Sequence, residues 1–220
     1  MCQKGRQMYT KIHTQKDVLR ERYLYQSELT PLGFPKLLPV HAALSGLNAV
    51  SFCEAAKEKN PKKSLCHFFI DDARFEPLWN QPQKYLPTLE NFKYICAPDF
   101  SFYDSMPKVV QLHQVYRSRA LAWWLFMNGC NVIPTVGWGN TETFEFCFEG
   151  LPEESTLAVS TNGCFTDQGK ECYRQGFKEM CSRLHPTEIL VVGRPIDVDA
   201  DVKITYRESF GQLLTRKLRG

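Results

Sequence analysis

Short runs of apolar residues recur along the middle of the chain, and each is bounded by polar or turn-forming residues. The runs are LLPV (37–40), CHFFI (66–70), YICA (94–97), NVIPTV (131–136), TLAVS (156–160) and EILVVG (188–193). They favour β-branched and aromatic side chains and show little alternation with polar positions. This pattern predicts short strands that are buried on both faces, as in a parallel sheet.

Helical patterns fill the intervals between these runs. They predict helices at residues 41–64, 85–92 and 167–184. A longer helix is expected after YICA, with Asp104 or Ser105 as its cap, Pro107 in its first turn and Gly129 just beyond its end. Its apolar residues recur every three or four positions, which predicts a stripe facing the core. The stripe consists of Val109, Leu112, Tyr116, Ala120, Trp123 and Met127.

Alternating buried strands and helices predict an α/β fold with a parallel sheet. At least five strand–helix units are visible, or six if residues 37–40 count as a strand. A closed eight-unit barrel usually needs about 250 residues, and this chain has 220. We therefore expect a parallel-stranded, TIM-barrel-like fold that is incomplete or trimmed, with an open doubly wound sheet as the alternative.

The composition is that of a globular protein, but the charge is unevenly distributed. Hydrophobic residues make up 43% and charged residues 23%, which predicts one domain with a substantial core. Residues 1–63 hold 11 Lys+Arg against 5 Asp+Glu, residues 64–202 hold 11 against 18, and residues 203–220 hold 5 against 1. We expect a basic and mobile or loosely docked arm at 1–22, a single α/β domain at 23–202 and a basic tail at 203–220. The basic ends suggest nucleic acid phosphates as partners, although packing onto the acidic body or simple solvation would explain them equally.

The cysteines and the absence of long apolar segments predict a cytoplasmic location. The nine cysteines form no CxxC pair, which argues against a zinc site, and several lie inside apolar runs. Such residues are typical of buried free thiols in a reducing compartment. No run of about 18 apolar residues exists to cross a membrane, and the basic N-terminus has no apolar segment behind it, so no secretory signal is expected.

Polar and aromatic residues stand where each predicted strand ends, which is where ligands bind in parallel α/β folds. These residues are Asp71, Asp72 and Arg74 after the first strand, Asp99, Ser101 and Tyr103 after the second, Trp138 and Asn140 after the third, Thr161, Asn162 and Gly163 after the fourth, and Gly193 and Arg194 after the fifth. The sequence therefore predicts one site at this edge of the sheet.

Asp71, Asp72 and Asp99 are the candidate catalytic residues. Two carboxylates brought close together have pKa values that move apart, which provides one acid and one base. Alternatively, Asp71 or Asp72 could hold a Mg²⁺ ion together with Asp99. Among the substrate-binding candidates, Arg74 and Arg194 would bind anions and Trp138 would stack on the substrate.

A purely structural interpretation of the same residues remains open. Aspartate and serine after a strand also cap helices, and Asp71 or Asp72 could pair with an arginine. The candidate arginines are Arg74, Arg117 and Arg119. His67, inside an apolar run, is expected to be a core histidine. The chain contains neither GxxxxGK[ST] nor GxGxxG, which argues against a P-loop ATPase and a dinucleotide-binding dehydrogenase.

Several strings resemble a family found in bacteria and in their phages and plasmids, the domain of unknown function 4417. The strings are HFFIDDARFEPLWNQPQKYL, APDFSFYDSMP, VYRSRALAWW, GCNVIPTVGWG and FEFCFEGLP. The resemblance runs from about Gly33 to Gly193, and DDxRFE and PDFS are its most specific parts. It implies a cytoplasmic protein carried on mobile elements, and it brings no reaction and no assigned catalytic residue.

Three functions follow as hypotheses. The first is an enzyme, a hydrolase or transferase, that uses the carboxylates at the strand ends on a small polar or nucleotide-like substrate. The second is a nucleic-acid-associated accessory protein of a phage or plasmid that acts through the basic ends. The third is a non-catalytic protein that binds a host factor.

Overall fold

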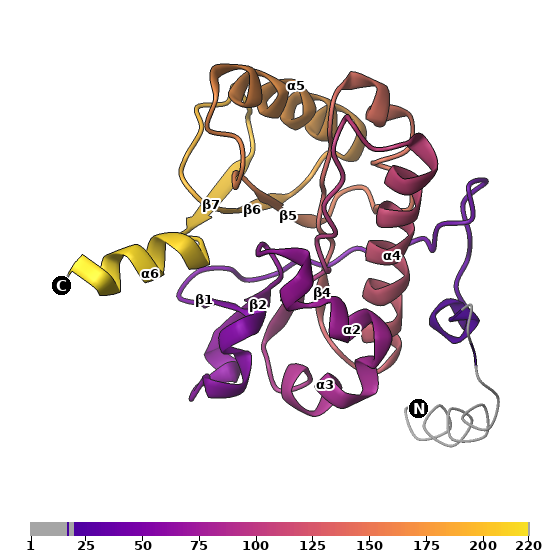
Figure 1. Ribbon diagram of the computed structural model, residues 1–220, viewed down its shortest axis with the longest axis vertical. Coiled ribbons are helices and arrows are strands. Elements are labelled where there is room, and N and C mark those ends of the chain that lie inside the picture. The colour runs from indigo at the N-terminus through magenta and orange to yellow at the C-terminus, as the bar shows by residue number, and fades with distance from the viewer. Residues whose placement is uncertain (1–16, 18–19, 220) are drawn as a thin grey trace.

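The computed structural model describes residues 17 and 20–219 and places seven parallel strands in two sheets. The predicted N-terminal arm falls largely outside these residues. The strands are β1 (Asn48–Ser51), β2 (Ser64–His67), β3 (Tyr94–Cys96), β4 (Val132–Ile133), β5 (Thr156–Ser160), β6 (Glu188–Val192) and β7 (Lys203–Arg207). Both sheets and the helices around them are visible in Figure 1.

Each strand pairs with its neighbour along the chain. The first sheet has the order β1-β2-β3-β4 and the second β5-β6-β7. An isolated parallel bridge between Thr135 and Ala158 joins the end of β4 to β5. No pairing closes β1 onto β7 among the described strands, so the fold is α/β with two parallel sheets and no closed barrel. Neither sheet contains the reversal of strand order that marks a doubly wound fold.

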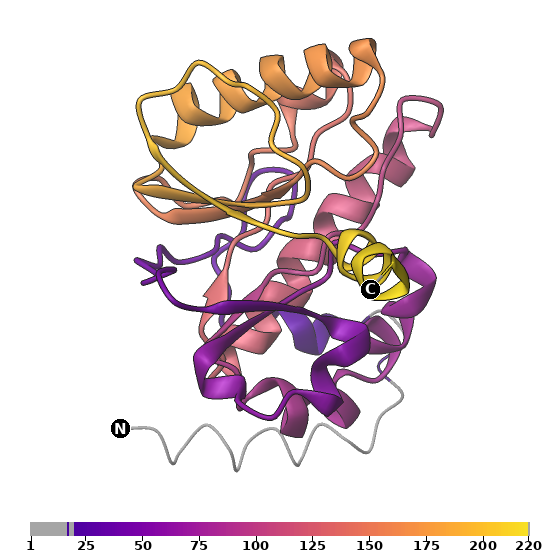
Figure 2. The same cartoon turned by 90° about the vertical axis from the view of Figure 1, so that its left-hand side faces the viewer.

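The described chain contains five α-helices, of which the first four pack on the outer faces of the sheets and the last lies beside the strand ends. They are α2 (Glu76–Asn80), α3 (Pro82–Leu89), α4 (Lys108–Met127), α5 (Asp167–Leu184) and α6 (Phe210–Arg219). Short 3-10 turns accompany them: η2 (Glu21–Leu24), η3 (Phe52–Lys57), η4 (Pro61–Lys63), η5 (Asp72–Arg74) and η6 (Thr141–Glu145). In Figures 1 and 2, α5 lies over the second sheet, α2 and α3 lie below the first, and α6 projects at the C-terminal end.

The core consists of three clusters of buried residues: one on the outer face of each sheet and one between the two sheets. One cluster packs between the first sheet and α2, α3 and α4, and a second packs between β5, β6 and α5. A third contains inward-facing residues of both sheets, including Leu65, Cys96, Ile133, Ala158 and Leu190. Because residues two apart on a strand share a face, β2 sends Leu65 inward and Cys66 outward. This inner cluster brings the two sheets together, so their carboxyl edges lie near each other.

The long helix α4 contacts both outer clusters, and it is not the simple amphipathic helix that its sequence predicts. Most of its second half is buried on all sides, whereas Val109 in its first turn is 71% exposed. The predicted cap is also wrong, because Pro107 occupies the N-cap position and no side chain caps the helix. Asp104 instead accepts a hydrogen bond from the Asn140 backbone N–H at 2.9 Å.

The sequence pattern does not predict two of the strands, and one strand that it predicts is absent. Residues 48–51, predicted to be helical, form β1, and residues 203–207, assigned to the basic tail, form β7 at the edge of the second sheet. Residues 37–40 form no strand, but the carbonyl of Val40 accepts the backbone N–H of Thr156 at 2.7 Å. In the described part of the chain, no helix is long and apolar enough to span a membrane.

Candidate functional site

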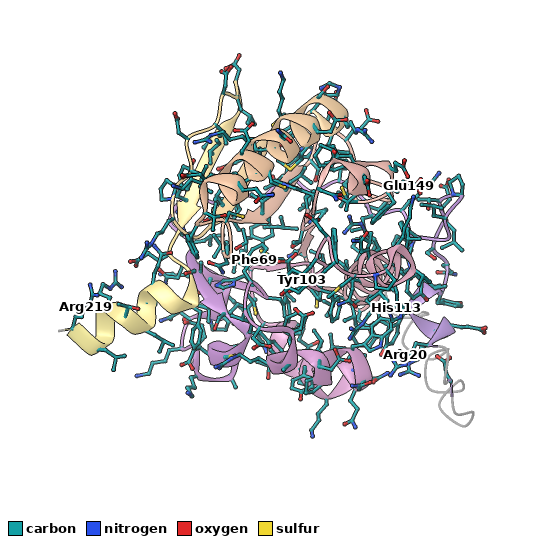
Figure 3. The ribbon with its side chains drawn as sticks, turned by 45° about the horizontal axis from the view of Figure 1, so that its top comes forward. Arg20, Phe69, Tyr103, His113, Glu149 and Arg219 are labelled. Carbon is teal, nitrogen blue, oxygen red and sulfur yellow. The ribbon has the colours of Figure 1, made fainter. Side chains whose placement is uncertain are left out.

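A cleft of about 850 Å³ opens at the carboxyl ends of β2, β3, β4 and β5. Of the residues predicted at the strand ends, seven line it: Asp71, Asp99, Ser101, Tyr103, Trp138, Asn162 and Gly163. The loop after β3 contributes residues 99–105 to the wall, including the apolar side chains of Phe100 and Phe102. Figure 3 shows two lining residues, Phe69 and Tyr103, over the middle of the molecule. The predicted edge of the sheet is therefore hollow.

Asp99 is the carboxylate with the most unusual surroundings in this cleft. It follows β3 closely and is partly buried, and no hydrogen bond or ion pair reaches its carboxylate from the described residues. A Cβ atom at Gly137 would lie 3.4 Å from its Oδ1, so the loop after β4 passes close to it. Burial and, to a smaller extent, the charge of Asp72 together raise the pKa of Asp99 to about 7, against a lowering by Arg119. A carboxyl group with this pKa exchanges protons near neutral pH.

The guanidinium of Arg119 provides the positive charge that lowers the pKa of Asp99. It is buried in α4, and donates to the carbonyl oxygens of Thr135 at 3.2 Å, Cys147 at 2.8 Å and Glu149 at 3.2 Å. Burial lowers its pKa to about 10. Because carbonyl groups satisfy its donors, Arg119 needs no carboxylate partner, which leaves Asp99 free. The predicted ion pair between Arg119 and Asp71 or Asp72 is not formed.

Asp72 faces the loop after β3 and does not line the cleft. It accepts the Ser101 hydroxyl at 2.9 Å and the Ser101 backbone N–H at 3.1 Å, with Gln114 at 3.5 Å. Burial raises its pKa, and the hydrogen bonds from Ser101 oppose that rise. No described ion pair includes Asp72; Arg117 pairs with Glu76. Asp72 thus holds the loop that carries Asp99 in place, and acts on the cleft through its charge.

Asp71 is exposed at the mouth of the cleft and also caps η5 by accepting the Ala73 backbone N–H at 2.9 Å. Asp71 therefore has a structural role as a cap and also lines the cleft. The Mg²⁺ hypothesis finds no complete ligand set, because no group of three or more His, Cys, Asp or Glu side chains in the described chain is placed to hold a metal ion.

Trp138 is held against α5. Its indole N–H donates to the Cys172 carbonyl at 3.3 Å, and its ring packs against Tyr173 with centroids 5.5 Å apart. A Cβ atom at Gly176 would lie 2.2 Å from the indole nitrogen, so only glycine leaves room for the ring. Trp138 lines the cleft as a fixed wall, and does not have the mobility of a free stacking platform.

Two other predicted site residues, Asn140 and Thr161, do not line the cleft. Asn140 caps η6 by accepting the Glu142 backbone N–H at 3.2 Å. Thr161 is 1% exposed and lines no cavity described here. His67 is fully buried, as expected of a core histidine, and burial lowers its pKa to about 4, so it is neutral near neutral pH.

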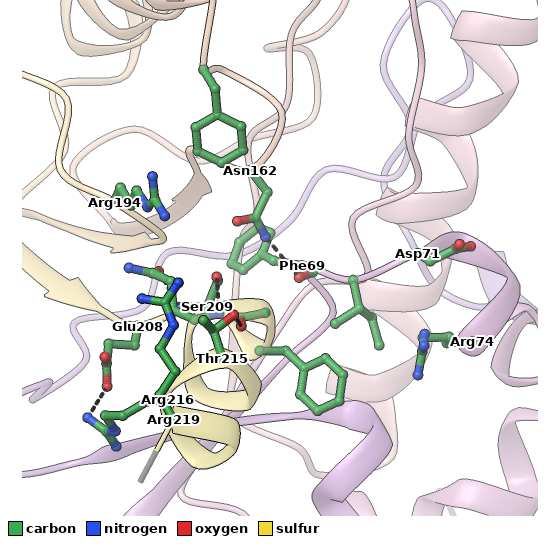
Figure 4. A pocket seen from close by; sticks show the side chains of 15 residues that line it. Phe69, Asp71, Arg74, Asn162, Arg194, Glu208, Ser209, Thr215, Arg216 and Arg219 are labelled. Atoms are coloured by element: carbon green, nitrogen blue, oxygen red, sulfur yellow. Dashed lines mark hydrogen bonds and ion pairs between the residues drawn. The ribbon is translucent and has the colours of Figure 1, made fainter.

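A second cavity of about 1000 Å³ adjoins the cleft, and we call it the arginine pocket. It shares Phe69, Ile70, Asp71 and Asn162 with the cleft. The predicted residues Arg74 and Arg194 line it, together with Arg216 and Arg219 of α6 (Figure 4). The sequence pattern marked the C-terminal segment as basic but could not place α6 beside the strand ends.

The comparisons with known proteins agree with the resemblance seen in the sequence. The model of a family described as "Domain of unknown function (DUF4417)" matches residues 26–209. "Gene 1 protein" of Mycobacterium phage L5 is 35% identical over 182 residues, which cover 81% of this chain and 78% of that protein. "Gene 1 protein" of Mycobacterium phage D29 is 32% identical over 179 residues, covering 81% of this chain and 66% of that protein. No solved structure matches the chain. With a family model that spans most of its length, and with phage relatives above 30% identity, the chain belongs to the DUF4417 family.

Proposed function

We propose that this protein is an enzyme, a hydrolase or transferase, in which Asp99 is the general acid or base. One observation carries the proposal: Asp99 has no hydrogen-bond or ion-pair partner among the described residues, lines the cleft at the carboxyl edge of the sheet, and has its pKa raised to about 7. A structural carboxylate normally has its charge satisfied by donors. One left without them in a cavity is typical of a catalytic group.

The chemistry follows from the two protonation states of Asp99. Near pH 7 both states are populated, so the same carboxyl can give a proton to a leaving group or take one from an attacking hydroxyl or water. The apolar wall formed by Phe100 and Phe102 limits its solvation. Asp72 positions the loop through Ser101, and its negative charge helps to keep Asp99 protonated.

A panel of nitrophenyl substrates tests this proposal. The panel contains carboxylic esters, glycosides, phosphomonoesters and phosphodiesters, and rates are measured between pH 5 and 9. We expect turnover of at least one class, a rate that changes around pH 7, and a loss of about 100-fold or more in Asp99→Asn. Asparagine has nearly the same shape as aspartate but exchanges no proton.

Asp201→Asn is the matched control, since Asp201 is exposed in the loop before β7 and outside both cavities. It removes the same charge and should leave the rate unchanged. The proposal is wrong if no class is turned over, or if Asp99→Asn is as active as the wild type.

The fold and the setting are proposed on separate grounds. For the fold, we propose a trimmed relative of the closed parallel barrel, because strand order follows chain order in both sheets and the Thr135–Ala158 bridge continues that order. For the setting, we propose the cytoplasm of a bacterium, with carriage by a phage. Eight described cysteines are free thiols, which suits a reducing compartment, and the curated relatives are phage proteins.

Contact with nucleic acid through the basic ends is a second candidate. One observation favours it: Arg216 and Arg219 of the basic C-terminal helix α6 line an open cavity. Contacts with many phosphates would make binding to an oligonucleotide fall steeply as salt rises. A fluorescence anisotropy titration at 50 and 200 mM salt measures this directly, and a flat response would exclude it.

A further inference from the structure

The arginine pocket carries more positive charge than its own carboxylates neutralise. Four arginines line it, namely Arg74, Arg194, Arg216 and Arg219, against two carboxylates, Asp71 and Glu208. Glu208 pairs with Arg216 at 2.6 Å, whereas no carboxylate side chain of the described chain pairs with Arg74, Arg194 or Arg219. Figure 4 shows Arg194, Arg216 and Arg219 on one side of the pocket and Arg74 with Asp71 on the other. Arginines gathered around a cavity without counter-charges favour an anionic ligand.

Aromatic side chains hold two of these guanidinium groups in place. The guanidinium carbon of Arg74 lies 5.7 Å from the ring centroid of Phe210, and that of Arg194 lies 5.7 Å from the ring centroid of Phe165. Stacking over a ring uses the face of the guanidinium and leaves the N–H groups at its edge for a ligand. Both arginines are exposed, so a dissolved anion can reach them.

The N-terminus of α6 is not the source of this anion preference. The Gln212 side chain accepts the Ser209 backbone N–H at 2.9 Å, and Ser209 Oγ accepts the Gln212 backbone N–H at 3.4 Å. This reciprocal cap already occupies donors at the start of the helix. The side chains of the arginines must therefore supply the binding.

Apolar side chains line the pocket beside the charged ones and the polar residues Asn162, Ser209, Gln212 and Thr215. Phe69, Ile70, Phe165 and Phe210 line it, and its volume of about 1000 Å³ is that of a site for a small organic molecule. A bare inorganic anion would leave these walls in water. A ligand with an anionic group and a flat apolar body would use both kinds of wall.

We infer that the arginine pocket binds a nucleotide, with its phosphate on the arginines and its base against the phenylalanines. This inference rests on the proposed function, since the pocket would present the phosphorylated substrate to Asp99. The two cavities meet at Phe69, Ile70, Asp71 and Asn162, and the Asn162 amide donates to the Phe69 carbonyl at 3.1 Å across this boundary. A nucleotide held in the pocket therefore extends toward the cleft.

Calorimetric titration of the full chain tests the inference, with the four ribonucleoside monophosphates, inorganic phosphate and adenosine as separate probes. We expect at least one monophosphate to bind at least tenfold more tightly than either inorganic phosphate or adenosine. In Arg74→Gln and Arg194→Gln, affinity for that monophosphate should fall by tenfold to hundredfold, because each removes a charge-assisted hydrogen bond. In Phe165→Ala it should fall about threefold to tenfold, with little change for inorganic phosphate.

Lys84→Gln is the charge-matched control, because Lys84 is exposed on α3 and outside both cavities. It should bind as the wild type does. The replaced pocket side chains are all exposed, and unchanged melting temperatures would verify that the variants fold.

Three results would overturn the inference: no monophosphate binds, the arginine variants bind like Lys84→Gln, or a single-stranded oligonucleotide binds far more tightly than any monophosphate with a steep salt dependence. The last would assign the arginines to a nucleic acid strand. Asp99→Asn keeps every arginine and should bind the monophosphate normally. Binding without Asp99-dependent turnover would leave this inference standing and reject the proposed enzyme, and turnover without binding would do the reverse.

Discussion

At the scale of single residues, adjacent aspartates have different roles that the sequence does not separate. Asp71 lies exposed at the cavity mouth, while Asp72 turns toward Ser101. Side-chain direction after a strand depends on the backbone of the exit loop, which no residue pattern encodes. Asp99 could be identified as a candidate because a strand ends just before it. Its missing partners could not be predicted, since they depend on Arg119 bonding to carbonyl oxygens instead.

The raised pKa of Asp99 predicts how stability changes with pH. In the folded protein its pKa is about 7, above the ordinary 3.8, so the folded state holds a proton that the unfolded state has released. The stabilisation from that proton is fully present below about pH 4 and is lost as the pH rises through about 7. Asp99→Asn cannot ionise, so it should unfold nearly like the wild type at pH 4 and be more stable by roughly 2–4 kcal/mol at pH 8.

Urea denaturation at both pH values measures this difference. Asp72→Ala is the contrasting variant, because it leaves the hydroxyl and the backbone N–H of Ser101 without their acceptor. We expect it to lose about 1–3 kcal/mol at pH 7. A destabilised Asp99→Asn at pH 8 would mean that Asp99 is a structural carboxylate, and would remove the main support for a catalytic role.

At the scale of elements, the predicted strands that the structure confirms are the buried ones. All residues of β2, β3 and β6 are buried, and four of the five in β5, so they appear in the sequence as nearly continuous apolar runs. The strands β1 and β7 lie at sheet edges and are mostly exposed or half-buried. An edge strand needs no apolar run, so the sequence pattern predicts a helix for NAVS and a tail for KITYR. Predictions from apolar runs therefore underestimate sheet width.

The packing of α5 on the loop after β4 depends on one glycine. A Cβ atom at Gly176 would lie between 2.2 and 2.4 Å from three atoms of the Trp138 indole. Gly176→Ala should therefore move α5 or expel Trp138 from its place in the cleft wall, at a cost of about 1–3 kcal/mol. The free energy of unfolding and the fluorescence of the variant would report both effects.

Gly211→Ala is the control for this prediction. Gly211 lies in α6, and a Cβ atom there would meet nothing within 4 Å. Alanine favours helix over glycine by up to about 1 kcal/mol, so this variant should be slightly more stable. If Gly176→Ala were equally well tolerated, Trp138 would be a mobile side chain and its suggested stacking on a ligand would regain support.

At the scale of the whole molecule, segments far apart in the sequence complete the same edge. The Arg207 guanidinium at the end of β7 donates to the carbonyl of Leu44 at 2.9 Å and of Leu47 at 3.1 Å, just before β1. These bonds join the last strand to the first without a strand pairing. Together with the Thr135–Ala158 bridge, they connect the two sheets on both sides. The sequence could not predict this arrangement, because it arises from contacts about 160 residues apart.

Arg207→Gln should therefore lower the free energy of unfolding of both sheets together. It removes two long-range hydrogen bonds from a half-buried guanidinium, which we expect to cost about 1–3 kcal/mol. Arg174→Gln is the matched control. Its guanidinium is exposed and donates to the Asp197 carbonyl within the second half of the fold, so its loss should cost less than about 1 kcal/mol.

Urea denaturation of both variants would be followed by tryptophan fluorescence and by circular dichroism. We expect coincident transitions, with the midpoint lowered clearly in Arg207→Gln alone. Two separate transitions in the wild type would show instead that the sheets unfold independently, and that a site shared between their edges depends on a weak connection.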